Sequence, residues 1–101
     1  MTRHSLKIYP GFFVPLKFGE KTFELRYDDR GYQIGDILNL REWSEKEGGY
    51  SGREIEFEVT YILSDFGLLK GFVVMSLRPL SDVTPPKDDV YVRGEVWVDS
   101  L

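Results

Sequence analysis

The chain is 101 residues long, has no cysteine and one histidine, and carries a formal net charge of −4. This length allows one domain with a modest core. The lack of cysteine excludes disulfides, thiolate catalysis and cysteine-based zinc sites, and no stretch is long and apolar enough to span a membrane. The negative charge argues against a protein that coats nucleic acid by bulk electrostatics.

Charge is unevenly placed along the chain. The first 30 residues hold six Lys or Arg and four acids, a balance of +2, and the remainder carries −6. Two interpretations follow: a localised basic site on an acidic body, or a solvated surface of scattered charges.

Short strands are expected at residues 6–9 and 21–26. Residues 11–18 between them suit a short helix if its first turn holds Pro15, because the missing N–H of a proline is harmless there.

The middle of the chain carries the strongest strand signals. Residues 36–43 read as a strand, and residues 53–63 alternate apolar with acidic or polar side chains, a period of two that predicts a strand with one wet face. The link at 44–52 holds three glycines and predicts a hairpin loop. The apolar run at 72–77 predicts a strand covered on both faces.

Composition changes after Pro79. Residues 80–89 look like an extended linker, and residues 90–98 alternate again. This last segment predicts an extra strand that extends the sheet edge or pairs with a second copy, giving a monomer or a weak homodimer. We therefore expect a domain at 1–78 and a C-terminal extension at 79–101. The fold class is α+β, mainly β: a small β-barrel of five to six strands with one or two short helices.

Several chemistries are excluded by residue type and spacing. One histidine and no cysteine argue against ordinary zinc or iron sites, so we expect neither a metal nor a cofactor. His4 and Ser5 are neighbours on a strand and face opposite ways, so they cannot act together in a Ser-His-Asp triad. The Asp28-Asp29 pair is explained more simply by a turn than by a metal site.

One segment invites a functional interpretation. On the 21–26 strand, one face holds Thr22, Glu24 and Arg26, and the other holds Lys21, Phe23 and Leu25. Glu24 and Arg26 lie about 7 Å apart along their face. The simpler account is a surface salt bridge worth about 0–1 kcal/mol. The functional account places both groups at the mouth of a pocket, where Glu24 accepts from an exocyclic amine and Arg26 engages a phosphate or a base edge.

The pattern Gly19-x-Lys21-Thr22-x-Glu24-x-Arg26, followed by Gly35-Asp36 opening a strand that ends at Trp43, resembles the ASCH domains. More narrowly, it resembles an uncharacterised branch from bacteria, archaea and phages. The likeness covers residues 4–78, and its motifs lie at 4–7, 29–30, 35–38, 40–43, 50–53 and 59–62.

This resemblance implies a PUA-like β-barrel with a cleft near the 21–26 strand and the first helix. ASCH domains are widely proposed to bind RNA, and one branch hydrolyses acetylated cytidine with a lysine, a threonine and a glutamate. The lysine falls on Lys21, but the threonine position is Glu24, whose carboxylate cannot repeat the role of the hydroxyl.

Two functions remain in view, with the first preferred. One is a module that binds single-stranded RNA or a modified base. The other is an amidohydrolase of a modified nucleoside such as acetylated cytidine, with Lys21 as general base or electrostatic stabiliser and Glu24 in proton transfer. A third, simpler possibility is a protein-interaction domain that uses the acidic face of Glu54, Glu56 and Glu58 together with the tail strand at 90–98.

The expected binding site is a cleft in which Arg26 and Lys21 hold phosphate, Glu24 reads a base amine, and an aromatic ring stacks on the base. The candidates for stacking are His4, Tyr9 and Trp43. Arg26→Ala should then cost more affinity than the same change at Arg78. A cytoplasmic location is the default, because the first residues lack the apolar run of a signal peptide. The expected ligand-binding residues are His4, Lys7, Lys21, Glu24, Arg26, Arg30 and Trp43.

Overall fold

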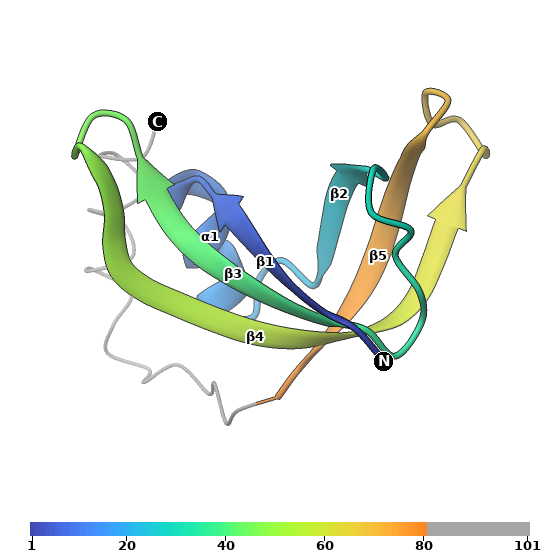
Figure 1. Cartoon of the computed structure of the whole chain (residues 1–101), viewed down its shortest axis with the longest axis horizontal. Helices are drawn as coiled ribbons and strands as arrows, with labels where there is room; N and C mark the ends of the chain where they lie inside the picture. The colour runs from blue at the N-terminus through green and yellow to red at the C-terminus, as the bar shows by residue number, and fades with distance from the viewer. Residues whose placement is uncertain (81–101) are drawn as a thin grey trace.

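The computed structural model describes residues 1–80, which form a strongly curled five-stranded sheet with one helix packed inside the curl (Figure 1). The elements are β1 (Arg3–Ile8), α1 (Pro10–Lys17), β2 (Phe23–Tyr27), β3 (Ile37–Ser44), β4 (Gly49–Ser64) and β5 (Phe72–Pro79). The predicted α+β, mainly β fold is confirmed. The strand expected at 90–98, and any pairing through it, lies outside the described residues. Within 1–80, no helix has the length and apolar character needed to cross a membrane.

The strand order β1-β3-β4-β5-β2 leaves one edge of β1 and one edge of β2 unpaired. β1 runs parallel to β3, and the other three pairings are antiparallel. Because the sheet curls, the two end strands face each other across the opening of a half-barrel (Figure 1). No backbone ladder joins β1 to β2 within residues 1–80, so this opening is free for side chains and ligands.

The long strand β4 joins the two halves of the curl. Its predicted alternation is confirmed as far as Val59, with Ile55, Phe57 and Val59 buried, but it is wrong beyond that residue, because Tyr61 is exposed. A bulge between Val59 and Tyr61 then shifts the register against β5. Since an extra residue changes which side chains face inward, Ile62 packs against the core and Tyr61 faces outward.

Helix α1 starts earlier than expected, at Pro10, and Pro15 lies in its interior. Pro10 occupies the first turn, where proline is favoured. Pro15 has no backbone N–H, so the helix loses one of the few hydrogen bonds that eight residues can form. The Pro15 carbonyl accepts the backbone N–H of Glu20 at 2.9 Å and of Lys21 at 3.1 Å, which ties the end of α1 to the approach to β2. The buried side chains of the helix are Phe13, Val14, Pro15 and Leu16.

Two strand predictions need correction. The loop between β3 and β4 is shorter than the expected 44–52, because pairing resumes at Gly49. The prediction that residues 72–77 are covered on both faces is wrong for the described part of the chain. Val73 and Met75 are buried, but Phe72 and Val74 stay half-buried on the outer face.

Candidate functional site

A cleft of about 480 Å³ opens between the free edges of β1 and β2, beside the first turn of α1. This volume lies within the usual range for small-molecule sites, and most of the lining is apolar. Its walls are formed by Lys7, Ile8 and Tyr9, by Phe12 of α1, by Lys21, by Phe23, Glu24, Leu25, Arg26 and Tyr27 of β2, and by Phe72.

Glu24 is the buried carboxylate of this cleft, with 4% of its surface exposed. Its Oε1 accepts from Lys21 Nζ at 3.2 Å, and its Oε2 accepts from Arg26 Nε at 2.8 Å. Two cations compensate one carboxylate, so burial of this charge is balanced by charge-assisted hydrogen bonds. The simple surface salt bridge is excluded, because Glu24 is buried and engages both neighbours.

The cations of the cleft also lie against aromatic rings. Lys21 Nζ is 4.8 Å from the ring centroid of Phe12 and 5.2 Å from that of Phe23. Lys7 Nζ lies 4.2 Å from the ring centroid of Trp43. These are cation–π distances. The two contacts of Lys21 hold its ammonium group against the apolar wall of the cleft, whereas Trp43 is not part of the lining.

The cleft is locally positive although the chain is acidic. Its lining holds three cationic side chains and one carboxylate, which gives +2, against −4 for the whole chain. Cations around a low-dielectric cleft attract anions more strongly than the same charges spread over a surface.

The backbone of β2 offers hydrogen-bonding groups to the same space. At the two ends of β2, the Thr22 carbonyl accepts from the Leu77 N–H and the Asp28 N–H donates to the Gly71 carbonyl. Because the hydrogen-bonded positions of an antiparallel pair alternate, the backbone groups of the even-numbered residues of β2 bond to β5. Odd-numbered residues of an antiparallel strand direct their groups the other way. The N–H and C=O of Leu25 therefore point out of the ladder, into the cleft.

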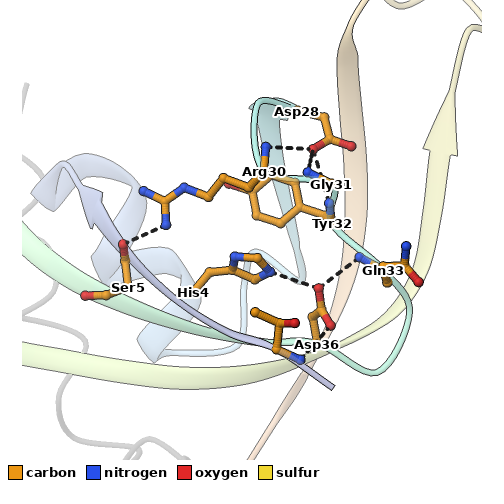
Figure 2. Close-up of polar contacts among 9 residues, drawn as sticks. His4, Ser5, Asp28, Arg30, Gly31, Tyr32, Gln33 and Asp36 are labelled. Atoms are coloured by element: carbon orange, nitrogen blue, oxygen red, sulfur yellow. Dashed lines mark hydrogen bonds and ion pairs between the residues drawn. The ribbon is translucent and has the colours of Figure 1, made fainter.

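Two arginines bridge the opening between the end strands. Arg26 Nη2 donates to the Lys7 carbonyl at 2.6 Å, and Arg30 Nη1 donates to the Ser5 carbonyl at 3.3 Å. Figure 2 shows Arg30 reaching from the loop after β2 across to β1. These guanidinium groups take the place of a backbone ladder, because they satisfy carbonyls on the free edge of β1.

His4 lies below the Arg30 bridge and does not line the cleft. It is 6% exposed, its Nε2 is 2.8 Å from Asp36 Oδ2, and its ring meets Tyr32 edge-on at 4.8 Å (Figure 2). The parallel pairing of β1 with β3 places Asp36 beside His4. Ser5, in contrast, is exposed on the opposite face, which confirms that His4 and Ser5 do not act as a pair.

Asp36 is the centre of this supporting layer. Burial by itself raises the pKa of Asp36. The hydrogen bonds with His4 and with the backbone N–H groups of Thr2 and Gln33 together lower the pKa by more than burial raises it, so the pKa lies below its usual value. For Tyr32, burial raises the pKa, and the nearby positive charges of Arg26 and Arg30 oppose this in part.

The loop between β2 and β3 is fixed by Asp28. Its Oδ1 accepts from the backbone N–H groups of Arg30, Gly31 and Tyr32 (Figure 2). The predicted turn at Asp28-Asp29 is therefore confirmed, and it holds Arg30 in position for its bridge to β1. Among residues 1–80, no three His, Asp or Glu side chains are grouped as a metal site would require.

A third buried carboxylate, Glu42, lies outside the cleft. Arg53 donates Nε to Oε1 at 2.8 Å and Nη2 to Oε2 at 2.6 Å, and the Ser51 hydroxyl donates to Oε1 at 2.7 Å. Burial raises the pKa of Glu42, and the contacts with Arg53 and Ser51 lower it below the usual value overall. This bidentate pair joins β3 to β4 at the far end of the curl.

Four of the predicted site residues line one cleft: Lys7, Lys21, Glu24 and Arg26. The other three do not line it. His4 and Arg30 belong to the layer beside the cleft, and the ring of Trp43 lies under the Lys7 ammonium group. Sequence reasoning missed most of the apolar wall. Exposed aromatic side chains next to the basic segment were the available signal, and the missed residues are Ile8, Phe12, Phe23, Leu25, Tyr27 and Phe72.

Comparison with known proteins places the chain among uncharacterised relatives. Residues 3–77 match the family described as "Domain of unknown function (DUF3850)". The chain is also 32% identical over 82 residues to the "Uncharacterized 12.9 kDa protein in GpA 3'region" of Escherichia phage P2, a match that covers 81% of this chain and 72% of the phage protein. The match to the family spans β1 to β5, including every strand that borders the cleft. The chain belongs to the DUF3850 family.

Proposed function

We propose that this protein binds a nucleotide, free or within single-stranded RNA, in the cleft between β1 and β2. One observation carries the proposal: Lys21 and Arg26 hold the buried carboxylate of Glu24 in an aromatic-walled cleft that Lys7 also lines. A cationic rim suits phosphate, and an apolar wall suits the flat face of a base.

The polar groups of the cleft suit a base edge. Leu25 directs one donor and one acceptor outward from the same residue, as a strand does toward its partner. A nucleobase carries adjacent donors and acceptors on its edge and can take the place of that partner strand. Glu24 bonds both cations, yet a carboxylate has about four lone-pair sites, so it retains capacity for an exocyclic amine.

The family-level likeness agrees with this function. Residues 4–78 resemble ASCH domains, which are proposed to bind RNA, and the curled sheet with its helix is compatible with a PUA-like barrel. The phage relative is uncharacterised and adds no ligand.

The test is isothermal titration calorimetry of the four nucleoside monophosphates into wild type, Arg26→Gln and Arg41→Gln. Arg41 is the matched control, because it is also paired with a glutamate and lies over a ring, but on the other half of the sheet. We expect wild type and Arg41→Gln to bind alike and Arg26→Gln to bind at least tenfold more weakly, since a hydrogen bond to a charged group is worth about 1.5–3 kcal/mol. Equal losses for both variants, or no binding by wild type, would refute the proposal.

A second candidate is hydrolysis of an acylated nucleoside. Direct contact between Lys21 and Glu24 inside the cleft favours it, because a positioned lysine and carboxylate can share proton transfer. Against it, Lys21 and Arg26 already hold the two oxygens of Glu24, an arrangement that accounts for the buried carboxylate without a catalytic role. Incubation with acetylated cytidine decides the matter: acetate release that disappears in Lys21→Met would establish an enzyme, and no release leaves a binding protein.

A further inference from the structure

The outer, convex face of the sheet is divided into two unlike halves. On the half formed by β1, β3 and the first part of β4, outward side chains form cross-strand ion pairs, as a solvated sheet face should. The pairs are Arg3 with Glu56, Arg41 with Glu54, and, at the boundary with the other half, Arg78 with Glu58.

The other half of the outer face is formed by β2, β5 and the end of β4, past the Arg78 pair. Its outward-facing paired positions contain no Asp, Glu, Lys or Arg. The register places Leu25 beside Val74, and Val74 beside Leu63, in one row across three strands. The next row places Phe23 beside Ser76, and Ser76 beside Tyr61. We call this surface the outer apolar patch; its members are Phe23, Leu25, Tyr61, Leu63, Phe72 and Val74.

The patch is exposed and continuous with the cleft. Phe23 is 44% exposed, Leu25 50% and Tyr61 58%. Phe23, Leu25 and Phe72 also line the cleft, so they form one surface that passes from its wall onto the sheet face. An apolar surface of this kind, next to a half that carries cross-strand ion pairs, indicates a binding surface rather than ordinary solvent exposure.

We infer that single-stranded RNA crosses the outer apolar patch, with one nucleotide in the cleft and its neighbour stacked on Tyr61. This inference rests on the proposed nucleotide site and extends it from a mononucleotide to a short strand. Exposed aromatics on a sheet face are suited to stacking bases, which is sequence-tolerant. Phe23 and Tyr61 are two strands apart, roughly 10 Å, so they offer separate positions to successive bases.

Charge is arranged to suit this path. Lys21 Nζ lies 5.2 Å from the ring centroid of Phe23 at the cleft end of the patch, and Arg78 borders the row of Tyr61 at the other end. Arg78 is paired with Glu58, so the positive charge of the path lies at its cleft end. No described acid lies within the aromatic rows to repel the phosphates. A protein partner would need no cleft, whereas a strand of RNA uses the cleft and the patch together.

The inference is tested by measuring affinities for nucleoside monophosphates and for labelled RNA oligomers of about five nucleotides. The proteins compared are wild type, Tyr61→Ala, Tyr61→Phe and Tyr50→Ala. Tyr50 is the matched control: it is an exposed tyrosine of the same strand, 49% exposed, on the charged half. We expect Tyr61→Ala to weaken oligomer binding roughly 5- to 150-fold while leaving mononucleotide binding unchanged. Tyr61→Phe should keep the oligomer affinity, because the ring that stacks is retained.

The outcomes separate the inference from the function on which it rests. If mononucleotides bind but oligomers bind no tighter, or Tyr61→Ala matches Tyr50→Ala, the stacking path is refuted and the cleft stands. If neither ligand binds wild type, both fail. If sedimentation shows a dimer that Tyr61→Ala dissociates, the patch is an interface between copies, and the inference is overturned.

Discussion

Buried carboxylates organise this small domain at the residue scale. Glu24, Asp36 and Glu42 are each almost fully enclosed, and each is held by at least two hydrogen-bond donors. Burial of an unpaired charge would cost several kcal/mol, so these clusters restrict where the strands can lie. Glu24 differs from the other two because its donors line an open cleft and remain accessible to a ligand.

Glu24→Gln tests whether Glu24 positions the two cations. The amide keeps the size of the side chain but leaves Lys21 and Arg26 without their counter-charge, so we expect a loss of about 1–3 kcal/mol in the free energy of unfolding. Urea denaturation measures this loss. The matched change Glu54→Gln alters an exposed pair with Arg41 and should cost under about 1 kcal/mol. Equal costs would show that Glu24 is not the organising group.

Asp36→Asn tests the supporting layer through pH. The pKa of Asp36 is lowered in the folded state, so its carboxylate stabilises the fold above the unfolded value of about 3.9. That contribution is lost as pH falls through the folded pKa. We expect wild type to exceed the variant in unfolding free energy by about 1–3 kcal/mol near neutral pH.

The difference between wild type and Asp36→Asn should narrow below about pH 4, because the variant has no carboxyl to protonate at this position. Denaturation at a series of pH values measures it. A difference that stays constant down to pH 3 would contradict the role of the Asp36 charge.

Strand alternation made part of the site predictable. The shared face of Glu24 and Arg26 follows from the period of two in β2, and the two side chains are in direct contact. Lys21 was expected on the other face, but the strand begins only at Phe23, so alternation does not govern Lys21 and its side chain turns back to Glu24. Local spacing also could not indicate the partner of His4, because Asp36 lies 32 positions away and is brought close by a parallel pairing.

At the element scale, the strands themselves were well predicted and their order was not. β4 was visible from its apolar alternation, β5 from a short apolar run, and the β3–β4 hairpin from the glycines between the two strands. The pairing of β2 with β5 spans the 44 residues between Tyr27 and Phe72. It carries no local signal, since any free edge of matching length can serve. That pairing is what leaves the other edge of β2 facing β1 and so creates the cleft.

Leu25→Pro tests the free edge of β2. Proline is tolerated on an edge strand where the N–H faces away from the ladder, so the bonds of β2 to β5 should survive. Leu25→Ala is the control, because it removes the side chain and keeps the N–H. We expect both variants to fold, with the proline variant binding nucleotide about tenfold more weakly than the alanine variant.

Calorimetry measures these affinities, and amide hydrogen exchange in β5 checks that the ladder is intact. Equal affinity of Leu25→Pro and Leu25→Ala would show that the outward N–H of Leu25 makes no contact with the ligand.

At the scale of the whole molecule, a small positive cleft on an acidic body determines where an anionic ligand is attracted. The chain carries −4, yet the ionisable side chains lining the cleft sum to +2. An acidic surface disfavours indiscriminate adhesion to nucleic acid, and the local cations favour one anionic group at one place. Binding should therefore weaken with added salt, but with a shallow slope that reflects one or two phosphate contacts.

The curl of the sheet gives this cleft its shape. β1 and β2 approach across the opening without pairing, and Arg26 and Arg30 hold the two edges at a fixed separation. A small domain with one layer of core depends on such links, because little buried apolar surface is available to hold the edge strands. The same guanidinium group of Arg26 thus serves both the fold and the proposed ligand.

The most direct test of the account is an amide-shift NMR titration of the labelled protein at low salt, with the nucleoside monophosphates and a short single-stranded RNA. We expect the shifts to cluster on the two facing edges of the opening, at Lys7, Lys21, Glu24, Leu25 and Arg26. Absence of any shift on β1 and β2 with every ligand, or shifts confined to the charged outer half of the sheet, would contradict it.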